Sequence, residues 1–253
     1  MTAGLRRASW RREGTAAVVG VLVVASLAVT AVAVFDSQRE GAAAKEASAE
    51  YTPPPIPSPP SRAPVVGTRG DPPVTIIGDD FSVQDSSGVK QYWPEIAAKA
   101  AKVRATIFAD SGAGYLAEPE DGEGAFPASA AQLDKSTRAV ILFGGANDAA
   151  ASTVSVYRAA ASTVAAVQLA APKATVVMIG PAWPVSKIPA EVLRIRDVVR
   201  AAAALAHVRF VDPIAGRWLT ASDALNPNGA TLTKKGQESI ATHMTVVLRT
   251  AVQ

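Results

Sequence analysis

The chain has 253 residues, of which 49% are hydrophobic and 19% are charged, and its formal net charge is +3. This balance is typical of a folded protein with one sizeable domain and additional segments. Cysteine is absent, which excludes a disulfide framework, a thiolate zinc site and a cysteine nucleophile. No stretch of the sequence interleaves Lys and Arg with aromatic residues, so nucleic acid is not an expected partner.

Residues 15–35 form an apolar run without a charge, long enough at about twenty residues to cross a bilayer as a helix. Residues 1–14 carry four arginines, so the positive-inside rule predicts a cytoplasmic N-terminus and a single-pass protein of the plasma membrane with an extracytoplasmic domain. The alternative is secretion after signal cleavage, because Ala31-Val32-Ala33 has the small-x-small form of a cleavage site. Both interpretations predict export of the rest of the chain.

Residues 36–73 are predicted to be an extracytoplasmic linker. The segment is rich in alanine and then in proline, with closely spaced prolines between Pro53 and Pro64. Proline lacks a backbone donor and fixes φ near the polyproline II value, so we expect this segment to join neither a helix nor a sheet. It would act as a semi-rigid spacer between the membrane and the domain.

Residues 74–253 alternate between short apolar runs and longer helical patterns. The runs are rich in β-branched residues and are apolar throughout, which is typical of parallel strands covered on both faces. The predicted strands are Val74–Ile77, Ala105–Phe108, Ala139–Phe143, Thr175–Ile179 and Val208–Val211. The predicted helices are Gln91–Lys102, Ala151–Ala171, Ala190–Ala206 and Thr233–Val252. This order predicts an α/β fold, a doubly wound, mainly parallel five-stranded sheet with flanking helices in three layers.

A polar, glycine-rich cluster follows each predicted strand. Gly78-Asp79-Asp80 follows the first strand, Gly112 lies after the second, and Gly145-Ala146-Asn147-Asp148 follows the third. The fifth strand leads to Asp223-Ala224-Leu225-Asn226. Ligands of doubly wound sheets bind beyond the carboxyl ends of the strands, so these clusters predict a common site there.

The order and spacing of these clusters resemble the SGNH (GDSL-type) hydrolases over essentially all of residues 74–253. In that family a Gly-Asp-Ser block supplies a serine nucleophile. Two further blocks supply a glycine N–H and an asparagine amide, which form an oxyanion hole with the N–H of the nucleophile. A last Asp-x-x-His block supplies the base and the aspartate that orients it. The resemblance implies that Gly112 and Asn147 are the oxyanion-hole residues and that Asp223 is the orienting acid.

Two positions depart from the family pattern. Asp80 stands where the family has its serine, and Asn226 stands where it has its histidine. Acyl transfer needs a hydroxyl that loses its proton and a base that titrates near neutrality. Asn226 has no titratable acceptor, and Asp80 is already anionic at neutral pH. The sequence therefore predicts a degenerate site, with catalytic positions Asp80, Asn226 and Asp223 that are not functional.

The chain has only two histidines, His207 and His243. His207 precedes the last predicted strand, so we expect it at the amino end of the sheet, away from the site. His243 lies about ten residues into the last predicted helix, roughly 15 Å from the rim along the helix axis. Ser82 and Ser111 lie near the rim without an evident base, and we expect both to be hydrogen-bonding turn or cap residues.

The carboxylate of Asp80 has two interpretations. We hypothesise that it fills the oxyanion hole itself, because the N–H of Gly112 and the amide of Asn147 lie nearby if the fold is kept. The alternative is that Asp80 caps the following helix in solvent. No cofactor is expected. A metal site at which Asp79, Asp80, Asp148 and Asp223 converge with Asn147 is a further alternative, because oxygen ligands suit Ca²⁺ or Mg²⁺.

Two functions follow from these observations. The first is a catalytically inactive binding or accessory module of a bacterial cell envelope, whose partner is an envelope glycan, an acylated polymer or a membrane protein. The second is an SGNH-type esterase or acyl hydrolase that acts on carbohydrate or lipid esters with non-standard catalytic residues, which rests on analogy of fold.

Overall fold

The computed structural model describes residues 63–83, 92–119, 124–184, 188–220, 224–226 and 231–253. The predicted membrane span 15–35, the segment 1–14, most of the predicted linker 36–73 and residue Asp223 lie outside this set. Among the helices of the described part, none is long and apolar enough to span a membrane.

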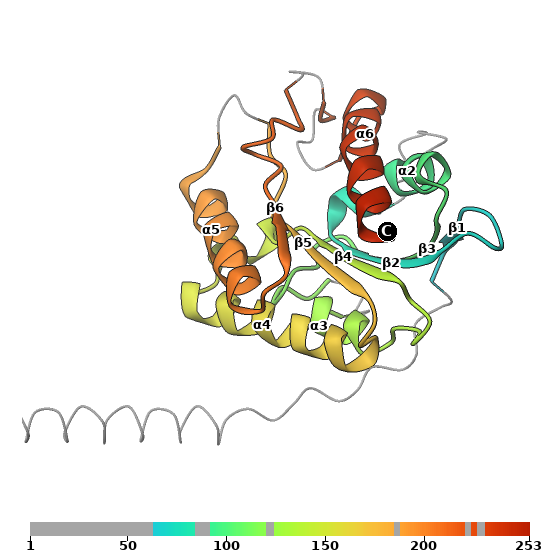
Figure 1. Ribbon diagram of the computed structural model, residues 1–253. Coiled ribbons are helices and arrows are strands. Elements are labelled where there is room, and N and C mark those ends of the chain that lie inside the picture. Colours follow the sequence, from blue (N-terminus) through green and yellow to red (C-terminus); the bar gives the residue numbers. More distant parts are fainter. Residues whose placement is uncertain (1–62, 84–91, 120–123, 185–187, 221–223, 227–230) are drawn as a thin grey trace, which may run out of the picture. The chain divides into compact units, whose positions relative to one another are not determined.

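The strands form one six-stranded sheet with the order β1-β3-β2-β4-β5-β6 (Figure 1). Their bounds are β1 Val65–Val66, β2 Pro73–Gly78, β3 Arg104–Ala109, β4 Ala139–Phe143, β5 Thr175–Ile179 and β6 Arg209–Val211. Strands β2 to β6 pair in parallel with their neighbours. All five predicted strands are present, with ends displaced by one residue at most, so the mainly parallel α/β fold is confirmed.

The prediction of five strands was wrong by one. Strand β1 lies within residues 36–73, the segment expected to join no sheet, and pairs antiparallel with β3 through Val65↔Thr106 and Val66↔Ala105. The closely spaced prolines end at Pro64, and the next prolines are Pro72 and Pro73, so Val65 and Val66 keep their N–H groups. Pro64 itself lacks a donor but accepts, because its carbonyl bonds the N–H of Ile107 at 3.0 Å.

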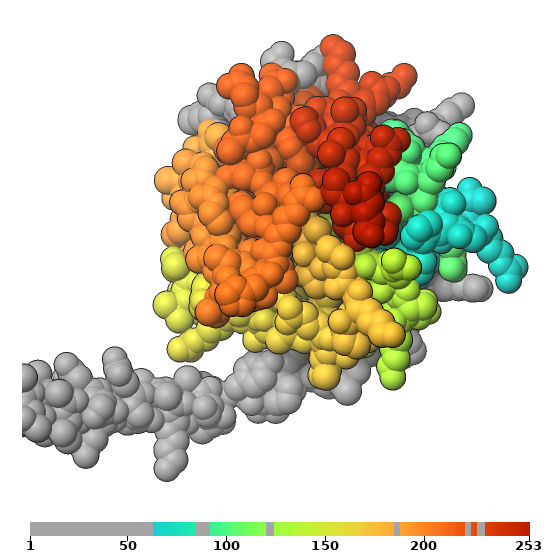
Figure 2. All heavy atoms as spheres, viewed as in Figure 1, coloured from blue at the N-terminus to red at the C-terminus, as the bar shows by residue number. Residues whose placement is uncertain are grey.

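Five α-helices lie on the two faces of the sheet in the described part of the chain. They are α2 Trp93–Ala101, α3 Phe126–Ala130, α4 Thr153–Ala170, α5 Ala190–Leu205 and α6 Lys234–Ala251. Helices α2 and α6 cover one face, and α3, α4 and α5 cover the other (Figure 1). In the all-atom view the orange and red segments of the last third of the chain adjoin one another on one side of the domain (Figure 2). Helix α3 was not predicted, because it has only five residues.

The sheet is buried on both faces. Ile76 and Ile141 pack toward α2 and α6, whereas Ile77, Leu142 and Met178 pack toward the opposite helices. This is why the strands read as continuous apolar runs rather than as an alternation. The polar residues that follow them are thereby brought to the carboxyl edge of one rigid sheet.

Candidate active site

Asp80, Gly112 and Asn147 meet at the carboxyl edge of the sheet, beyond strands β2, β3 and β4. The backbone N–H of Gly112 donates to Oδ1 of Asp80 at 3.1 Å, and Nδ2 of Asn147 donates to Oδ2 at 2.6 Å. Both oxygens of the Asp80 carboxylate therefore accept from the two groups that the family resemblance assigns to the oxyanion hole. Charge-assisted hydrogen bonds of this kind are about twice as strong as neutral ones.

The amide group of Asn147 is held by a second acceptor. Its Nδ2 also donates to the carbonyl oxygen of Ala113 at 2.9 Å. The two amide hydrogens thus point toward Asp80 and the loop after β3, while the residue itself is solvent-exposed. The loop reaches this position through a left-handed turn, since Gly112 has φ +82°, a conformation that a side chain would strain.

Asp79, the neighbour of Asp80, is buried beneath the site with 5% of its surface exposed. It caps the 3₁₀ helix η1, Asp80–Ser82, by accepting from the N–H of Phe81 at 3.2 Å. Asp79, and not Asp80, is therefore the side chain that caps this helix, contrary to the capping alternative for Asp80. Its carboxylate fills the space over Gly144, where an added Cβ would lie 2.4 Å from Oδ2.

Burial gives Asp79 an unusual protonation equilibrium. Loss of hydration, and after it the charge of Asp80, raises the pKa of Asp79 to about 7, although the N–H groups of Phe81 and Gly145 counter part of this increase. Asp79 therefore holds a proton over much of the range in which other carboxyl groups are ionised. Asp80, next to it, is only partly buried.

Asp148 shapes the loop that brings Gly112 into the site. Its buried carboxylate accepts from the N–H groups of Tyr115, Leu116 and Ala117 at 2.8, 2.9 and 2.8 Å. Three backbone donors compensate the cost of burying this carboxylate. Gly114 is required beside it, because an added Cβ would lie 2.7 Å from both carboxylate oxygens. The Asp of the Gly-x-Asn-Asp block thus has a structural function in this protein.

Asn226 forms hydrogen bonds with the segment just before α6. Its Nδ2 donates to Oγ1 of Thr231 at 2.8 Å and to the carbonyl of Leu232 at 3.3 Å, and its backbone N–H donates to the carbonyl of Thr231 at 2.9 Å. These bonds close a short antiparallel bridge, Leu225↔Leu232, just before α6. The side chain expected at the position of the base therefore fixes a loop, while Asp223 is not among the described residues.

The two histidines of the chain lie in different environments. His243 stacks on Trp218 with ring centroids 5.0 Å apart and an interplanar angle of 2°. Partial burial lowers the pKa of His243, which disfavours its charged form. His207 follows α5 with a left-handed φ of 54° and precedes β6, at the amino edge of the sheet.

Neither serine near the site offers a ready nucleophile. Ser82 is fully buried, and its Oγ has no hydrogen-bond partner within the described residues. The hydroxyl packs against Gly78, where an added Cβ would lie 2.2 Å away. Ser111 is exposed on the loop after β3. Ser82 does lie in a hydrogen-bonded turn, since its N–H donates to the carbonyl of Asp79 at 2.8 Å, but its hydroxyl packs in the interior and takes no part in that turn.

The described carboxylates do not converge as metal ligands. Across the ranges that the structure describes, no three His, Asp or Glu side chains come together to hold an ion. Asp80 and Asp148 direct their oxygens to protein donors instead. Asp223, the remaining carboxylate of the metal hypothesis, lies outside those ranges.

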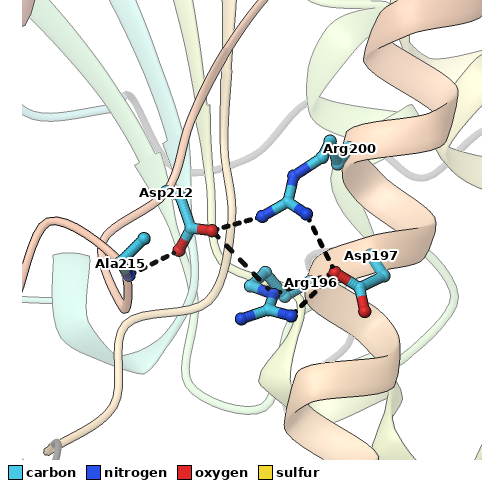
Figure 3. A network of polar contacts seen from close by, with 5 residues as sticks. All are labelled: Arg196, Asp197, Arg200, Asp212 and Ala215. Atoms are coloured by element: carbon cyan, nitrogen blue, oxygen red, sulfur yellow. Dashed lines mark hydrogen bonds and ion pairs between the residues drawn. The ribbon is translucent and has the colours of Figure 1, made fainter.

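A network of charged groups joins helix α5 to Asp212, the residue directly after β6 (Figure 3). Asp212, directly after β6, bonds the guanidinium of Arg200 and lies 3.9 Å from Nε of Arg196. Its Oδ1 also accepts from the N–H of Ala215 at 2.9 Å. Asp197 contacts the same two arginines at 2.9 and 3.2 Å. Partly exposed pairs of this kind contribute about 0.2–1 kcal/mol each, so the network orients the loop more than it stabilises the fold.

Comparison with known proteins identifies the family. Residues 76–245 match the GDSL-like Lipase/Acylhydrolase family, well over half of the chain. The chain belongs to this family. Among its relatives, the GDSL lipase Rv0518 of Mycobacterium tuberculosis is 30% identical over 174 residues, which cover 62% of this chain and 75% of that protein. The chain is thus an SGNH/GDSL esterase- or acylhydrolase-like protein.

Solved structures share the GDSL fold at low sequence identity. An aryl esterase of Mycobacterium smegmatis is 14% identical, with a TM-score of 0.55, and the match covers 71% of this chain and 99% of that one. Est24, a carbohydrate acetylesterase of Sinorhizobium meliloti, is 15% identical, with a TM-score of 0.53, and the match covers 71% of this chain and 97% of that one. At this identity the likeness concerns the fold alone.

Three contacts of the GDSL site could not be predicted from the sequence. The carbonyl of Ala113, which shares the amide of Asn147, could not be singled out because every residue has such a group. Thr231, the partner of Asn226, lies in a polar loop with several equivalent hydroxyls. The packing of Asp79 against Gly144 was signalled only by the paired glycines of the third cluster.

Proposed function

We propose that this chain is a catalytically inactive member of the GDSL family, which acts as a binding or accessory module. The observation that carries the proposal is the pair of hydrogen bonds from Gly112 and Asn147 to the carboxylate of Asp80. In an active member these donors wait for the oxyanion of a tetrahedral intermediate. Here the carboxylate of Asp80 accepts from both donors, so these two groups are not free to stabilise the oxygen of an ester carbonyl.

Proton transfer supports the same proposal. The amide of Asn226 accepts no proton at neutral pH and is already bonded to Thr231 and Leu232. Neither histidine takes over, since His243 is stacked on Trp218. Removing the serine or the histidine of a catalytic triad costs on the order of 10⁶ in turnover, and both are replaced in this chain.

Location defines the class of partner. We infer from the apolar run 15–35 and the arginines before it that the protein is anchored in the plasma membrane with its GDSL domain outside. An envelope glycan, an acylated polymer or a neighbouring membrane protein is then within reach. Resistance to alkaline carbonate extraction would support the anchor, whereas a soluble product of lower mass, cleaved after residue 33, would replace it with secretion.

Ester hydrolysis is the second candidate, and family membership favours it. The relative Rv0518 is named a GDSL lipase, and Est24 is named a carbohydrate acetylesterase. With this chain's residues, Asp80 would have to attack the carbonyl and form a mixed anhydride, which water would then hydrolyse. Among the described residues, the group beside Asp80 with a pKa near neutrality is Asp79, which is buried beneath the site and already accepts from the N–H of Phe81.

An assay with p-nitrophenyl acetate separates the two candidates. The full-length chain, purified in detergent, should release p-nitrophenol at the rate of buffer alone. The matched control for Asp80→Ala is Asp134→Ala. It removes an exposed carboxylate that precedes the amino end of β4, whereas Asp80 lies beyond the carboxyl end of β2. Turnover by the wild type that Asp80→Ala abolishes and Asp134→Ala preserves would establish the hydrolase and overturn the proposal.

A further inference from the structure

The site of this chain has the opposite hydrogen-bonding polarity to an oxyanion hole. Two of the three donors that the family pattern assigns to the hole, the N–H of Gly112 and the amide of Asn147, are used internally by Asp80. The second amide hydrogen of Asn147 is used by the carbonyl of Ala113. What Asn147 can offer a ligand is its carbonyl oxygen, and the residue is exposed. The groups left to bind a ligand are therefore the oxygens of Asp80 and Asn147, which accept hydrogen bonds, and not the N–H groups of Gly112 and Asn147.

Asp80 keeps acceptor capacity and charge after these bonds. A carboxylate offers about four lone-pair positions, of which donors from the described residues occupy two. The residue is only partly buried. None of the ion pairs in the described part of the chain involves Asp80, so its charge is balanced there by hydrogen bonds alone. A carboxylate that forms no ion pair with the described residues can accept further hydrogen bonds from a cationic donor.

We propose that Asp80 and Asn147 together bind a primary ammonium group, with the carboxylate of Asp80 as one acceptor and the carbonyl oxygen of Asn147 as a second acceptor. An ammonium carries three N–H donors and no acceptor, which matches the groups that the site presents. This inference rests on the proposed function, because it requires that the carboxylate occupies the former oxyanion hole. It names the ligand chemistry of that same site: an unacylated amine in place of an ester.

A metal ion fits the same acceptors less well. Ca²⁺ takes six to eight oxygen ligands, and Mg²⁺ demands a near-ideal octahedron. The described residues bring together one free carboxylate and one amide oxygen at this edge, and no set of three ligating side chains. A monovalent organic cation needs only this smaller number of partners.

Nuclear magnetic resonance of the asparagine side chains reads out binding at the site directly. The chain has three asparagines, Asn147, Asn226 and Asn228, so selective ¹⁵N labelling yields few side-chain amide signals. The probe is n-butylammonium, titrated into the full-length chain in detergent at constant ionic strength. N-butylacetamide, its neutral acylated counterpart, is the control ligand. We expect the Asn147 amide to shift saturably with n-butylammonium, with a Kd on the order of 0.1 M, because one partly exposed ion pair contributes about 1 kcal/mol.

Two variants at Asp80 make the result specific. Asp80→Asn should weaken the response at least tenfold, and Asp80→Ser, which restores the residue of the family pattern, should do the same. Asp134→Asn removes an exposed carboxylate elsewhere and should leave the Kd within twofold. Agreement between the two Asp80 variants separates loss of the carboxylate from misfolding of either one.

Three results would overturn the inference. They are the absence of a saturable shift at Asn147, an equal response to N-butylacetamide, and tighter binding of CaCl₂ than of n-butylammonium. Ester turnover is not measured in this titration, so its failure leaves the non-catalytic proposal intact. Turnover in the p-nitrophenyl acetate assay, by contrast, would remove the premise itself.

Discussion

The side-chain amide of Asn147 lies 2.6 Å from a carboxylate oxygen of Asp80, a residue 67 positions away in the sequence. The contact joins the ends of β2 and β4, which are neighbours in the sheet. The family pattern assigns Asn147 to the stabilisation of a transition state. In this protein the same amide donates to Asp80 without any ligand. In this structure Asp80 therefore uses both the amide of Asn147 and the N–H of Gly112.

Removing the amide should reveal how strongly the two residues are coupled. Asn147→Ala leaves the Asp80 carboxylate with the N–H of Gly112 as its remaining partner of the two. Hydrogen bonds to charged groups contribute about 1.5–3 kcal/mol, so we expect a loss of that order in the free energy of unfolding. Urea denaturation of Asn147→Ala, Asp80→Ala and the double variant gives the coupling energy. Additive effects of the two single substitutions would contradict the hydrogen bond.

The carboxylate of Asp148 should matter more for stability than that of Asp80. Asp148→Ala would leave three N–H groups, those of Tyr115, Leu116 and Ala117, without their acceptor. An unsatisfied buried donor costs about 1–3 kcal/mol; the N–H of Tyr115 is such a donor, whereas those of Leu116 and Ala117 are only partly buried and add less, so a loss of about 2–4 kcal/mol is expected. Thermal denaturation measures it. Asp134→Ala, at an exposed turn, should change the Tm little, and an equally small change for Asp148→Ala would contradict the assigned role.

Asp79 should make the protein less stable as the pH rises. Its pKa is about 7 in the folded chain, above the value of about 3.9 in an unfolded one. Between these values the folded state binds more protons, so stability contributed by the neutral carboxyl is full below pH 4 and declines up to about pH 7. The decline is on the order of 4 kcal/mol, since one unit of pKa corresponds to about 1.4 kcal/mol.

Substitution isolates this effect from the other titrating groups. Asp79→Asn keeps the shape of the side chain and removes the proton equilibrium. Its unfolding free energy, measured from pH 4 to pH 8, should rise relative to that of the wild type over this range and level off above pH 7. Parallel curves for the two proteins would show that Asp79 ionises normally.

Much of this architecture follows from local sequence patterns. The runs Ala139–Phe143 and Thr175–Ile179 are almost entirely apolar and rich in β-branched residues, which is typical of a strand covered on both faces. Their bounds were predicted without error. The edge strand Val65–Val66 was missed because its two residues follow a run of prolines and carry no period of their own. Pairing with β3, a tertiary contact, is what makes it a strand.

The candidate site was predictable in composition and only partly in geometry. Asp80, Gly112 and Asn147 could be brought together because parallel strands end at one edge. The different environments of the two adjacent aspartates could not be predicted. Asp79 and Asp80 are the same residue type at neighbouring positions, and only the folded structure buries the first and leaves the second partly exposed. Burial then raises the pKa of the first and leaves the second to bond Gly112 and Asn147.

Restoring the family residues should restore chemistry if the rest of the site is competent. Asp80→Ser returns a hydroxyl and frees the donors of Gly112 and Asn147, and Asn226→His returns a base. We expect the double variant to hydrolyse p-nitrophenyl acetate above the rate of buffer, and each single variant to remain within about tenfold of it, since triad residues act as a unit. A single Asp80→Ser variant as active as the double one would show that another residue serves as the base.

The most direct test of the central claim is the intact mass of the unmutated full-length chain after incubation with an activated ester, p-nitrophenyl acetate, and rapid acid quenching. An occupied oxyanion hole without a hydroxyl nucleophile or a base predicts the mass of the untreated protein. A mass increase of one acetyl group, mapped by peptide sequencing to Asp80 or to a serine at the sheet edge, would contradict the account.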